Sequence, residues 1–138
     1  MSRIPALFVL ACALGASAGL ARAQSSFVNW ENPHVHPLEL TPDGSRLLAV
    51  NTPDNRLEVF DLGAPRVLRA FDVPVGLDPV SVRARTNTEA WVVNHVSDSI
   101  SIVDLASGGV VRTLATDDEP ADVVFTPNPA RAFVTCSQ

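Results

Sequence analysis

The sequence contains no lysine and no tyrosine, and it has only two cysteines and one methionine in 138 residues. All 10 basic side chains are therefore arginines, and they stand against 15 acidic residues, which gives a formal net charge of −5. An acidic chain without a basic patch lacks the positive surface that attracts phosphate backbones and anionic membranes. We therefore expect neither nucleic acid nor an anionic lipid surface among its partners.

Helical periodicity is also missing, because no stretch of about ten residues or more carries an amphipathic helical stripe. Hydrophobic residues nevertheless make up 46% of the chain, which is enough to build a core and argues against disorder. The 11 prolines and 7 glycines indicate short elements separated by many turns. This composition favours one all-β domain.

The first 23 residues have the three parts of an export signal. Met1–Arg3 is a short basic start, Ile4–Leu20 is almost entirely apolar or small, and Ala21–Ala23 forms the small-x-small pattern of a cleavage site. We expect cleavage between Ala23 and Gln24, which leaves a mature chain of charge −7, with 8 arginines against 15 acids. The sequence thus predicts a periplasmic, extracellular or cell-surface protein.

Two other interpretations of this N-terminal run stay open. A membrane anchor would need an apolar run of about 20 residues, and this one is slightly shorter and rich in alanine and glycine. Val9–Cys12 resembles a bacterial lipobox, in which Cys12 would be lipidated, although this cysteine lies unusually early in the sequence. We expect no membrane span in the mature chain.

Cys136 is the single cysteine that remains if Cys12 leaves with the signal, so no disulfide within the chain is expected. An unpaired cysteine is uncommon in an oxidising compartment. Cys136 either has a partner in sequence beyond these residues or serves as a small buried apolar side chain.

An internal repeat with a period near 42 organises the rest of the chain. Pro37, Pro79 and Pro120 open three similar segments, 42 and 41 residues apart, and Asp61 and Asp104 are 43 apart. Within each copy apolar and polar residues alternate with period two, which indicates strands. The complete copy predicts four strands near 79–84, 89–94, 99–104 and 110–115. Four short strands in about 42 residues is typical of a β-propeller blade.

The repeats resemble the YVTN family of β-propeller repeats. The resemblance rests on Trp91–Leu105 (WVVNHVSDSISIVDL), on Gly109–Leu114, and on the turn Thr41–Gly44, and it extends over about residues 37–138. It implies an all-β fold made of propeller blades with four antiparallel strands each. A closed propeller uses roughly four to eight blades, whereas this chain holds about two and a half, so we expect an incomplete propeller.

The predicted organisation is a signal peptide at 1–23, a lead-in segment at 24–36 and a partial propeller at 37–138. The blades are expected at about 37–78 and 79–119, with a half-blade at 120–138. The open edge of the half-blade predicts either self-association or continuation into further blades.

Five residues of the repeat are expected to have structural roles. Asp61 and Asp104 close third strands, where each carboxylate can accept hydrogen bonds from the following turn. Asn51 and Asn94 can do the same and tolerate left-handed backbone angles. Trp91 supplies a large apolar surface between sheets, to which Phe60, Phe125 and Phe133 add.

His34 and His36 form the most suggestive chemical motif. Two histidines one residue apart on an extended segment face the same side, which is a geometry able to bind copper or zinc. His95 and Glu31 are candidates for completing the site. The flanking prolines make the strand geometry uncertain, and two surface histidines without a metal are the alternative.

Arg83 and Arg85 alternate in the same way on a first strand, which usually lines the central channel of a propeller. They either bind an anion there or pair with carboxylates such as Asp78, Glu89 or Asp122.

Function is less constrained than fold, because propellers carry many activities on one scaffold. No nucleophile elbow, phosphate loop or CxxCH haem motif is present, so we identify no catalytic or cofactor-binding residue. The sequence therefore favours a module that binds or scaffolds a protein or a small-molecule ligand. The alternative is part of a larger propeller enzyme, either lactonase-like or coupled to a downstream c-type cytochrome domain.

Overall fold

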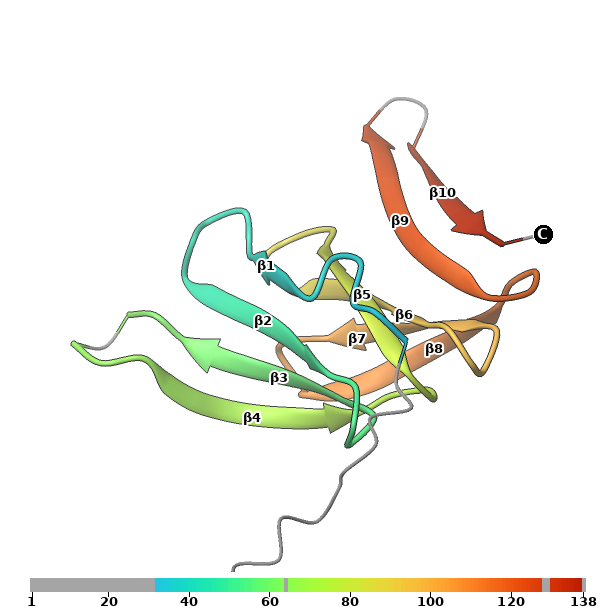
Figure 1. Cartoon of the computed structure of the whole chain (residues 1–138). Coiled ribbons are helices and arrows are strands. Elements are labelled where there is room, and N and C mark those ends of the chain that lie inside the picture. Colours follow the sequence, from blue (N-terminus) through green and yellow to red (C-terminus); the bar gives the residue numbers. More distant parts are fainter. Residues whose placement is uncertain (1–31, 64, 128–129, 138) are drawn as a thin grey trace, which may run out of the picture.

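The computed structural model describes residues 32–63, 65–127 and 130–137 (Figure 1). The expected signal peptide and Glu31 lie outside these residues. The regular secondary-structure elements of the described part are all β-strands, and none of that part forms a helix long and apolar enough to cross a membrane. The all-β fold is therefore confirmed.

The strands form three antiparallel sheets in chain order. The first sheet, blade 1, contains β1 (Leu38–Leu40), β2 (Arg46–Asn51), β3 (Arg56–Asp61) and β4 (Leu68–Pro74). The second sheet, blade 2, contains β5 (Pro79–Ala84), β6 (Glu89–Asn94), β7 (Ser99–Asp104) and β8 (Gly109–Ala115). The third, the half-blade, contains β9 (Pro120–Pro127) and β10 (Ala130–Cys136).

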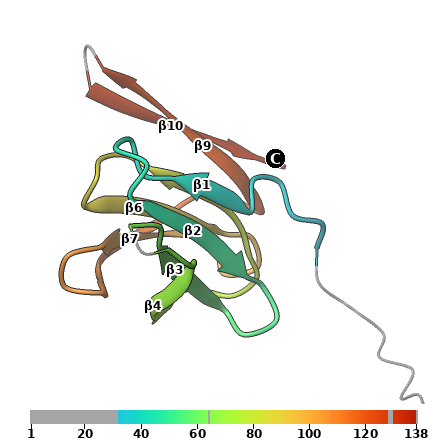
Figure 2. The same cartoon turned by 90° about the vertical axis from the view of Figure 1, so that its left-hand side faces the viewer.

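This arrangement confirms an incomplete propeller with four-stranded antiparallel blades. The four strands of blade 2 lie where the repeat predicted them, with β8 beginning one residue early. Figures 1 and 2 place the half-blade at one end of the molecule and β4 at the other. Blade 2 therefore lies between blade 1 and the half-blade.

The turns between second and third strands correct one expectation. Asn51 and Asn94 end β2 and β6, and neither has a positive φ. The left-handed residues are Asn55 (φ 54°) and Asp98 (φ 46°), four positions later in each repeat. The strand ladder holds the two asparagines extended, so the chain reverses only after them.

The same turn residues also connect each blade to the next. Asn55 Oδ1 accepts a hydrogen bond from the backbone N–H of Asp78 at 2.7 Å, and Asp98 Oδ1 accepts one from Glu119 at 3.0 Å. Asp78 and Glu119 themselves have positive φ values and immediately precede the first strand of the following sheet. A side chain in one blade thereby stabilises the sharp bend that starts the next.

The main core lies between blades 1 and 2. Blade 1 contributes Leu48, Leu57, Val59 and Val73, and blade 2 contributes Val82, Val92, Val103 and Leu105 among others. All eight side chains are at most 2% exposed. Burial of apolar surface at ~25 cal/mol per Å² makes this interface the principal apolar stabilisation of the fold.

A second core lies between blade 2 and the half-blade. Trp91, Ile100 and Ile102 pack there with Val123. The Trp91 and Phe125 rings meet edge to face, with centroids 5.1 Å apart and an interplanar angle of 83°. This confirms that Trp91 supplies apolar surface between sheets.

Gly76 lies in the connection from blade 1 to blade 2, and a substitution there tests how closely this connection packs against blade 2. A Cβ at this position would lie 2.4 Å from Ser97 Oγ and 2.6 Å from Cγ of the buried Asn94. We expect Gly76→Ala to lower the free energy of unfolding by about 1–3 kcal/mol, because the buried neighbour must move. Chemical denaturation followed by circular dichroism measures the change.

Gly109→Ala is the matched control, because a Cβ there meets no atom within 4 Å. Its free energy of unfolding should stay within about 0.5 kcal/mol of the parent protein. Equal effects of the two substitutions would contradict the close packing of the connection against Asn94.

Candidate functional site

The inner edge of the molecule brings the first strands of the three sheets together. β5 packs between β1 and β9. The lead-in segment pairs with β5 in parallel at His36 and Ser81, and Val82 donates its N–H to the His36 carbonyl at 2.9 Å. Side chains from all three sheets therefore meet along this edge.

Arg83 and Asp122 form the central contact of this edge. Arg83 Nε donates to Asp122 Oδ1 at 3.1 Å, and Arg83 Nη2 donates to Asp122 Oδ2 at 2.6 Å. Ser81 Oγ also donates to Asp122 Oδ1, at 2.6 Å. A two-pronged arginine–carboxylate contact of this kind fixes orientation as well as distance. It binds blade 2 to the half-blade.

Blade 1 joins the same network through His36 and Glu39. Arg83 Nη1 lies 3.1 Å from His36 Nε2 and 3.6 Å from Glu39 Oε2, and the histidine nitrogen lies 2.8 Å from the same Glu39 oxygen. We call His36, Glu39, Ser81, Arg83 and Asp122 the inner-edge network. The pairing of Arg83 with a carboxylate is thus confirmed, and its charge is already balanced within the protein.

The pKa values of the central pair reflect this contact. The hydrogen bond to Asp122 raises the pKa of Arg83 and outweighs the opposing effect of burial. Burial acts to raise the pKa of Asp122, but hydrogen bonds from Arg83, Ser81 and the Val123 backbone together lower it below its usual value. Both groups are therefore charged at neutral pH, and neither is available to transfer a proton.

The two predicted metal ligands have different partners. His34 Nε2 lies 2.6 Å from Thr52 Oγ1, and the Thr52 hydroxyl donates to the Pro79 carbonyl at 2.7 Å. Because that hydroxyl has a single proton, His34 Nε2 must be the donor in its own contact. His36 instead faces Glu39 and Arg83.

The remaining histidine, His95, places Nδ1 3.0 Å from the Pro120 carbonyl. In the part of the chain that the structure describes, no three His, Cys, Asp or Glu side chains form a metal-binding group. Glu31 lies outside that part. The copper or zinc site at His34 and His36 stays a prediction.

Asp61 and Asp104 make the turn contacts considered for them in the sequence. Asp61 Oδ1 accepts the Gly63 N–H at 2.8 Å, and Asp104 Oδ1 accepts the Ala106 N–H at 2.9 Å. The hydrogen bond from Ala106 is the main cause of a lowered pKa at Asp104. Both carboxylates close a blade turn.

Asn51 and Asn94 occupy equivalent positions but have different neighbours. Asn94 is fully buried, and its Nδ2 donates to Ser99 Oγ at 3.2 Å and to Ser101 Oγ at 3.0 Å. Asn51 instead donates to Glu58 Oε1 at 2.9 Å and also accepts the Asp54 N–H at 3.2 Å. The second of these contacts matches the expected turn hydrogen bond, whereas no such turn bond is found for Asn94 among the described contacts.

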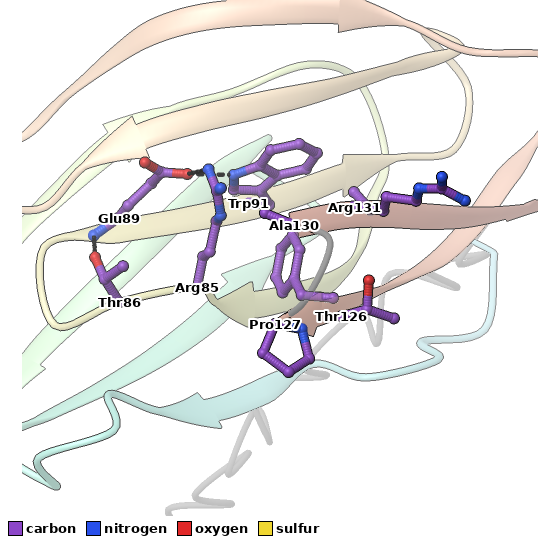
Figure 3. A pocket seen from close by; sticks show the side chains of 10 residues that line it. Arg85, Thr86, Glu89, Trp91, Thr126, Pro127, Ala130 and Arg131 are labelled. Atoms are coloured by element: carbon purple, nitrogen blue, oxygen red, sulfur yellow. Dashed lines mark hydrogen bonds and ion pairs between the residues drawn. The ribbon is translucent and has the colours of Figure 1, made fainter.

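A pocket of 680 Å³ lies between blade 2 and the half-blade (Figure 3). Trp91 and Phe125 form its apolar wall, and Arg85, Glu89 and Arg131 supply charged groups. Its volume falls in the range of small-molecule sites, about 300–1,000 Å³. Of these residues, sequence reasoning assigned Trp91 to packing and Arg85 to an anion site or an ion pair. Phe125 was assigned, like Trp91, to the apolar surface between sheets, and their ring contact confirms it. Sequence reasoning missed Arg131, which joins this pocket only through the blade geometry.

Arg85 is neutralised within the pocket. Its Nη1 lies 3.0 Å from Glu89 Oε1, which confirms the pairing with a carboxylate. The Arg85 guanidinium carbon is also 6.0 Å from the ring centroids of both Trp91 and Phe125. Arg131, by contrast, has no ion pair with any described residue, so it is the one arginine of this pocket that is open to an anion.

Glu89 is held as a carboxylate by its neighbours. Burial acts to raise its pKa, but hydrogen bonds from Trp91 Nε1, at 2.7 Å, and from Arg85 together lower it. A carboxylate held in this way positions Trp91 and Arg85 and does not serve as a general acid near neutral pH. The pocket therefore offers binding groups without a poised proton donor.

Known proteins resemble this chain in structure. No protein-family model and no curated protein matches it, so the YVTN resemblance stays a prediction. Hydrazine synthase from Kuenenia stuttgartiensis matches 83% of this chain at 25% identity with a TM-score of 0.68. A putative 6-phosphogluconolactonase from Bacteroides uniformis matches 78% at 17% identity with a TM-score of 0.63.

A protein of unknown function from Desulfotomaculum acetoxidans also matches 72% of the chain at 16% identity, with a TM-score of 0.64. The hydrazine synthase and the putative lactonase have propeller-type folds, which supports the propeller assignment. The matches cover 32%, 34% and 35% of the three solved chains. This chain thus spans about a third of the length of the solved chains it resembles.

The Arg83–Asp122 contact predicts a pH dependence of stability. Because the pKa of Asp122 is lowered in the folded protein, its contribution is present above the unfolded pKa of about 4 and is lost as the pH falls through the lower, folded value. Asp122→Asn should remove that contribution and flatten the loss of stability below about pH 4. Urea denaturation at pH values from about 2.5 to about 7 measures this dependence.

A double-mutant cycle measures the strength of the interaction between Arg83 and Asp122, and a second ion pair serves as its control. For Arg83→Gln and Asp122→Asn we expect a coupling of about 1–2 kcal/mol, since the contact is charge-assisted but partly solvated. The control pair is Arg69 and Glu58, which are 3.5 Å apart with the Arg69 side chain 53% exposed. That pair should couple by no more than about 1 kcal/mol. Equal coupling in the two cycles would contradict the central role of Asp122.

Proposed function

We propose that this chain forms part of an exported β-propeller that works as a binding module, with its ligand in the pocket between blade 2 and the half-blade. The observation that carries the proposal is the composition of this pocket. An edge-to-face pair of aromatic rings lines the same pocket as Arg131, an arginine without an ion pair among the described residues. Apolar walls with a few convergent polar groups are typical of ligand sites.

The pocket chemistry favours a flat apolar molecule with one negative charge. Trp91 and Phe125 offer stacking and edge contacts to a planar group. Arg85 is balanced by Glu89, so Arg131 is the positive charge that remains to pair with a carboxylate. We therefore infer an aromatic or similarly planar carboxylate, either free or displayed on a protein.

Binding is favoured over catalysis by the state of the titratable groups. Asp122, Glu89, Asp43 and Asp104 all have lowered pKa values, which fits carboxylates that hold structure in place. A general acid or base works best with a pKa near the working pH. The same module could also serve as a scaffold, and this role is supported by the inner-edge network, which joins the three sheets.

Benzoate is a suitable probe of the pocket, and benzylamine is its cationic counterpart. In a Trp30→Phe background, Trp91 is the sole tryptophan and reports binding by fluorescence. We expect saturable binding of benzoate and no binding of benzylamine. Arg131→Gln should weaken benzoate binding about tenfold, the loss expected for one charge-assisted contact.

Arg66→Gln is the control, because it makes the same change of charge on blade 1, away from the pocket. It should leave the affinity for benzoate unchanged. A pocket that binds both probes equally, or neither of them at millimolar concentration, would rule out the proposed ligand class.

A role as part of a larger propeller enzyme is the second candidate. It is favoured by the likeness to hydrazine synthase and to a putative lactonase, both much longer than this chain. In that case the active site would be completed by further sequence, which could be lactonase-like or contain a c-type cytochrome domain. The inner-edge network would then form one rigid side of that active site.

One experiment separates these candidates and tests export. We expect the native protein in the periplasmic or secreted fraction, with a mature N-terminus at Gln24, because Ala21–Ala23 provides the cleavage pattern. Mass spectrometry and an absorption spectrum of that species are the measurements. A haem spectrum would favour the redox enzyme, and recovery from the cytoplasm with Met1 intact would contradict export.

A further inference from the structure

One end of the molecule gathers the connections β2–β3, β4–β5, β6–β7 and β8–β9. Hydrogen bonds join each to the next: Asn55 to Asp78, His95 to Asp78, and Asp98 to Glu119. These connections, residues 52–55, 75–78, 95–98 and 116–119, contain no arginine and six acids: Asp54, Asp78, Asp98, Asp117, Asp118 and Glu119. None of the six forms an ion pair with a described residue. We call this surface the acidic end.

Two apolar side chains interrupt the acidic end. Leu77 is 52% exposed and Val96 is 56% exposed. Their connections lie against each other, because the Leu77 N–H donates to Ser97 Oγ at 3.0 Å and the His95 N–H donates to the Asp78 carbonyl at 3.0 Å. Leu77 and Val96 therefore belong to neighbouring loops, and we call them the apolar pair.

The lead-in segment is anchored beside the apolar pair. Asn32 Nδ2 donates to Asp78 Oδ2 at 2.6 Å, and His34 Nε2 lies 2.6 Å from Thr52 Oγ1. Asp78 directly follows Leu77 in the sequence, and Thr52 belongs to the β2–β3 connection of the same end. The chain thus reaches Asn32 next to the apolar pair.

The eight residues before this anchor, 24–31, lie outside the described residues. Their sequence, QSSFVNWE, contains three large apolar side chains, Phe27, Val28 and Trp30. Alternate side chains of an extended chain face the same way, so Val28 and Trp30 would share the side of Asn32 that meets Asp78, and Phe27 would take the other. Two residues span at most about 7 Å, which keeps Trp30 within reach of Leu77.

We propose that this N-terminal segment of the mature chain docks on the acidic end, with Val28 and Trp30 packed on Leu77 and Val96. Trp30 is the main anchor, because a packed aromatic side chain buries about 150–250 Å². The tether favours this occupant, since a segment on a short linker has an effective concentration on the order of millimolar.

A second copy is a less suitable occupant of the apolar pair. Two copies that met through their acidic ends would place six acids against six, and like charges across an interface disfavour association. The segment 24–31 brings a single acid, Glu31. Neither Leu77 nor Val96 lines the pocket that contains Arg131, so this proposal and the proposed ligand can fail separately.

Fluorine NMR of the chain that begins at Gln24 tests the docking. Labelling with 5-fluorotryptophan gives one resonance each from Trp30 and Trp91, and Trp30→Phe assigns them. The Trp30 resonance should differ in position from that of a synthetic peptide copying residues 24–36. It should also shift less between light and heavy water than in the peptide, because a packed indole is shielded from solvent.

Two leucines give a matched pair of protein variants. Leu77→Ser should move the Trp30 resonance to its position in the free peptide, whereas Leu68→Ser should leave it unchanged. Leu68 is 53% exposed, almost the same as Leu77, but it begins β4 at the end away from the acidic end. Both residues are exposed, so neither substitution should unfold the protein.

Two substitutions in the segment test which side of it packs. Trp30→Ser should lower the melting temperature of the chain, because the main apolar contact is lost. Phe27→Ser should leave the melting temperature unchanged, because Phe27 takes the side away from the protein.

The proposal is overturned if Trp30 has the resonance position and solvent exposure of the free peptide, or if the two leucine variants behave alike. Equal destabilisation by Trp30→Ser and Phe27→Ser would contradict the proposed side. A Trp30 resonance that changes with protein concentration would identify a second copy as the source of the segment and would also overturn the proposal.

Discussion

The contact between Arg83 and Asp122 is the interaction on which the relative placement of the three sheets depends. Apolar packing is non-directional, so the two cores alone would allow the sheets to slide. The planar guanidinium fixes the half-blade in angle as well as distance, and its remaining nitrogen reaches His36 and Glu39 of the lead-in segment and blade 1. One side chain of β5 thereby ties together three repeats.

Much of the fold could be predicted because the repeat is visible three times. The alternation of Ile100 and Ile102 with serines, and the 43-residue spacing of Asp61 and Asp104, placed the strands of blade 2 to within one residue. The candidate site could be predicted less well from the sequence. Arg83 meets His36 from 47 positions earlier and Asp122 from 39 positions later, and no local pattern encodes such contacts. The pocket likewise depends on Phe125 and Arg131, which the fold brings from the half-blade to the same pocket as Trp91 of blade 2.

The asparagines show how one motif residue can have two roles. Asn94 has two small serines opposite it, so the connection at Gly76 can close over it and bury it. Asn51 has Arg56 and Glu58 at those positions, and it stays half-buried beside a charged ladder. The motif asparagine is therefore common to both blades, whereas the residues opposite it decide whether that face packs against a neighbour or contacts water.

The parallel pairing at His36 and Ser81 has a consequence for folding. The lead-in segment completes its main-chain hydrogen bonds on β5, where Val35 donates to the Val80 carbonyl 45 residues later in the chain. The segment before blade 1 therefore cannot reach its native hydrogen bonding until blade 2 exists. Non-local closures of this kind slow folding and make neighbouring elements unfold as one cooperative unit. We therefore expect blades 1 and 2 to unfold together as one cooperative unit.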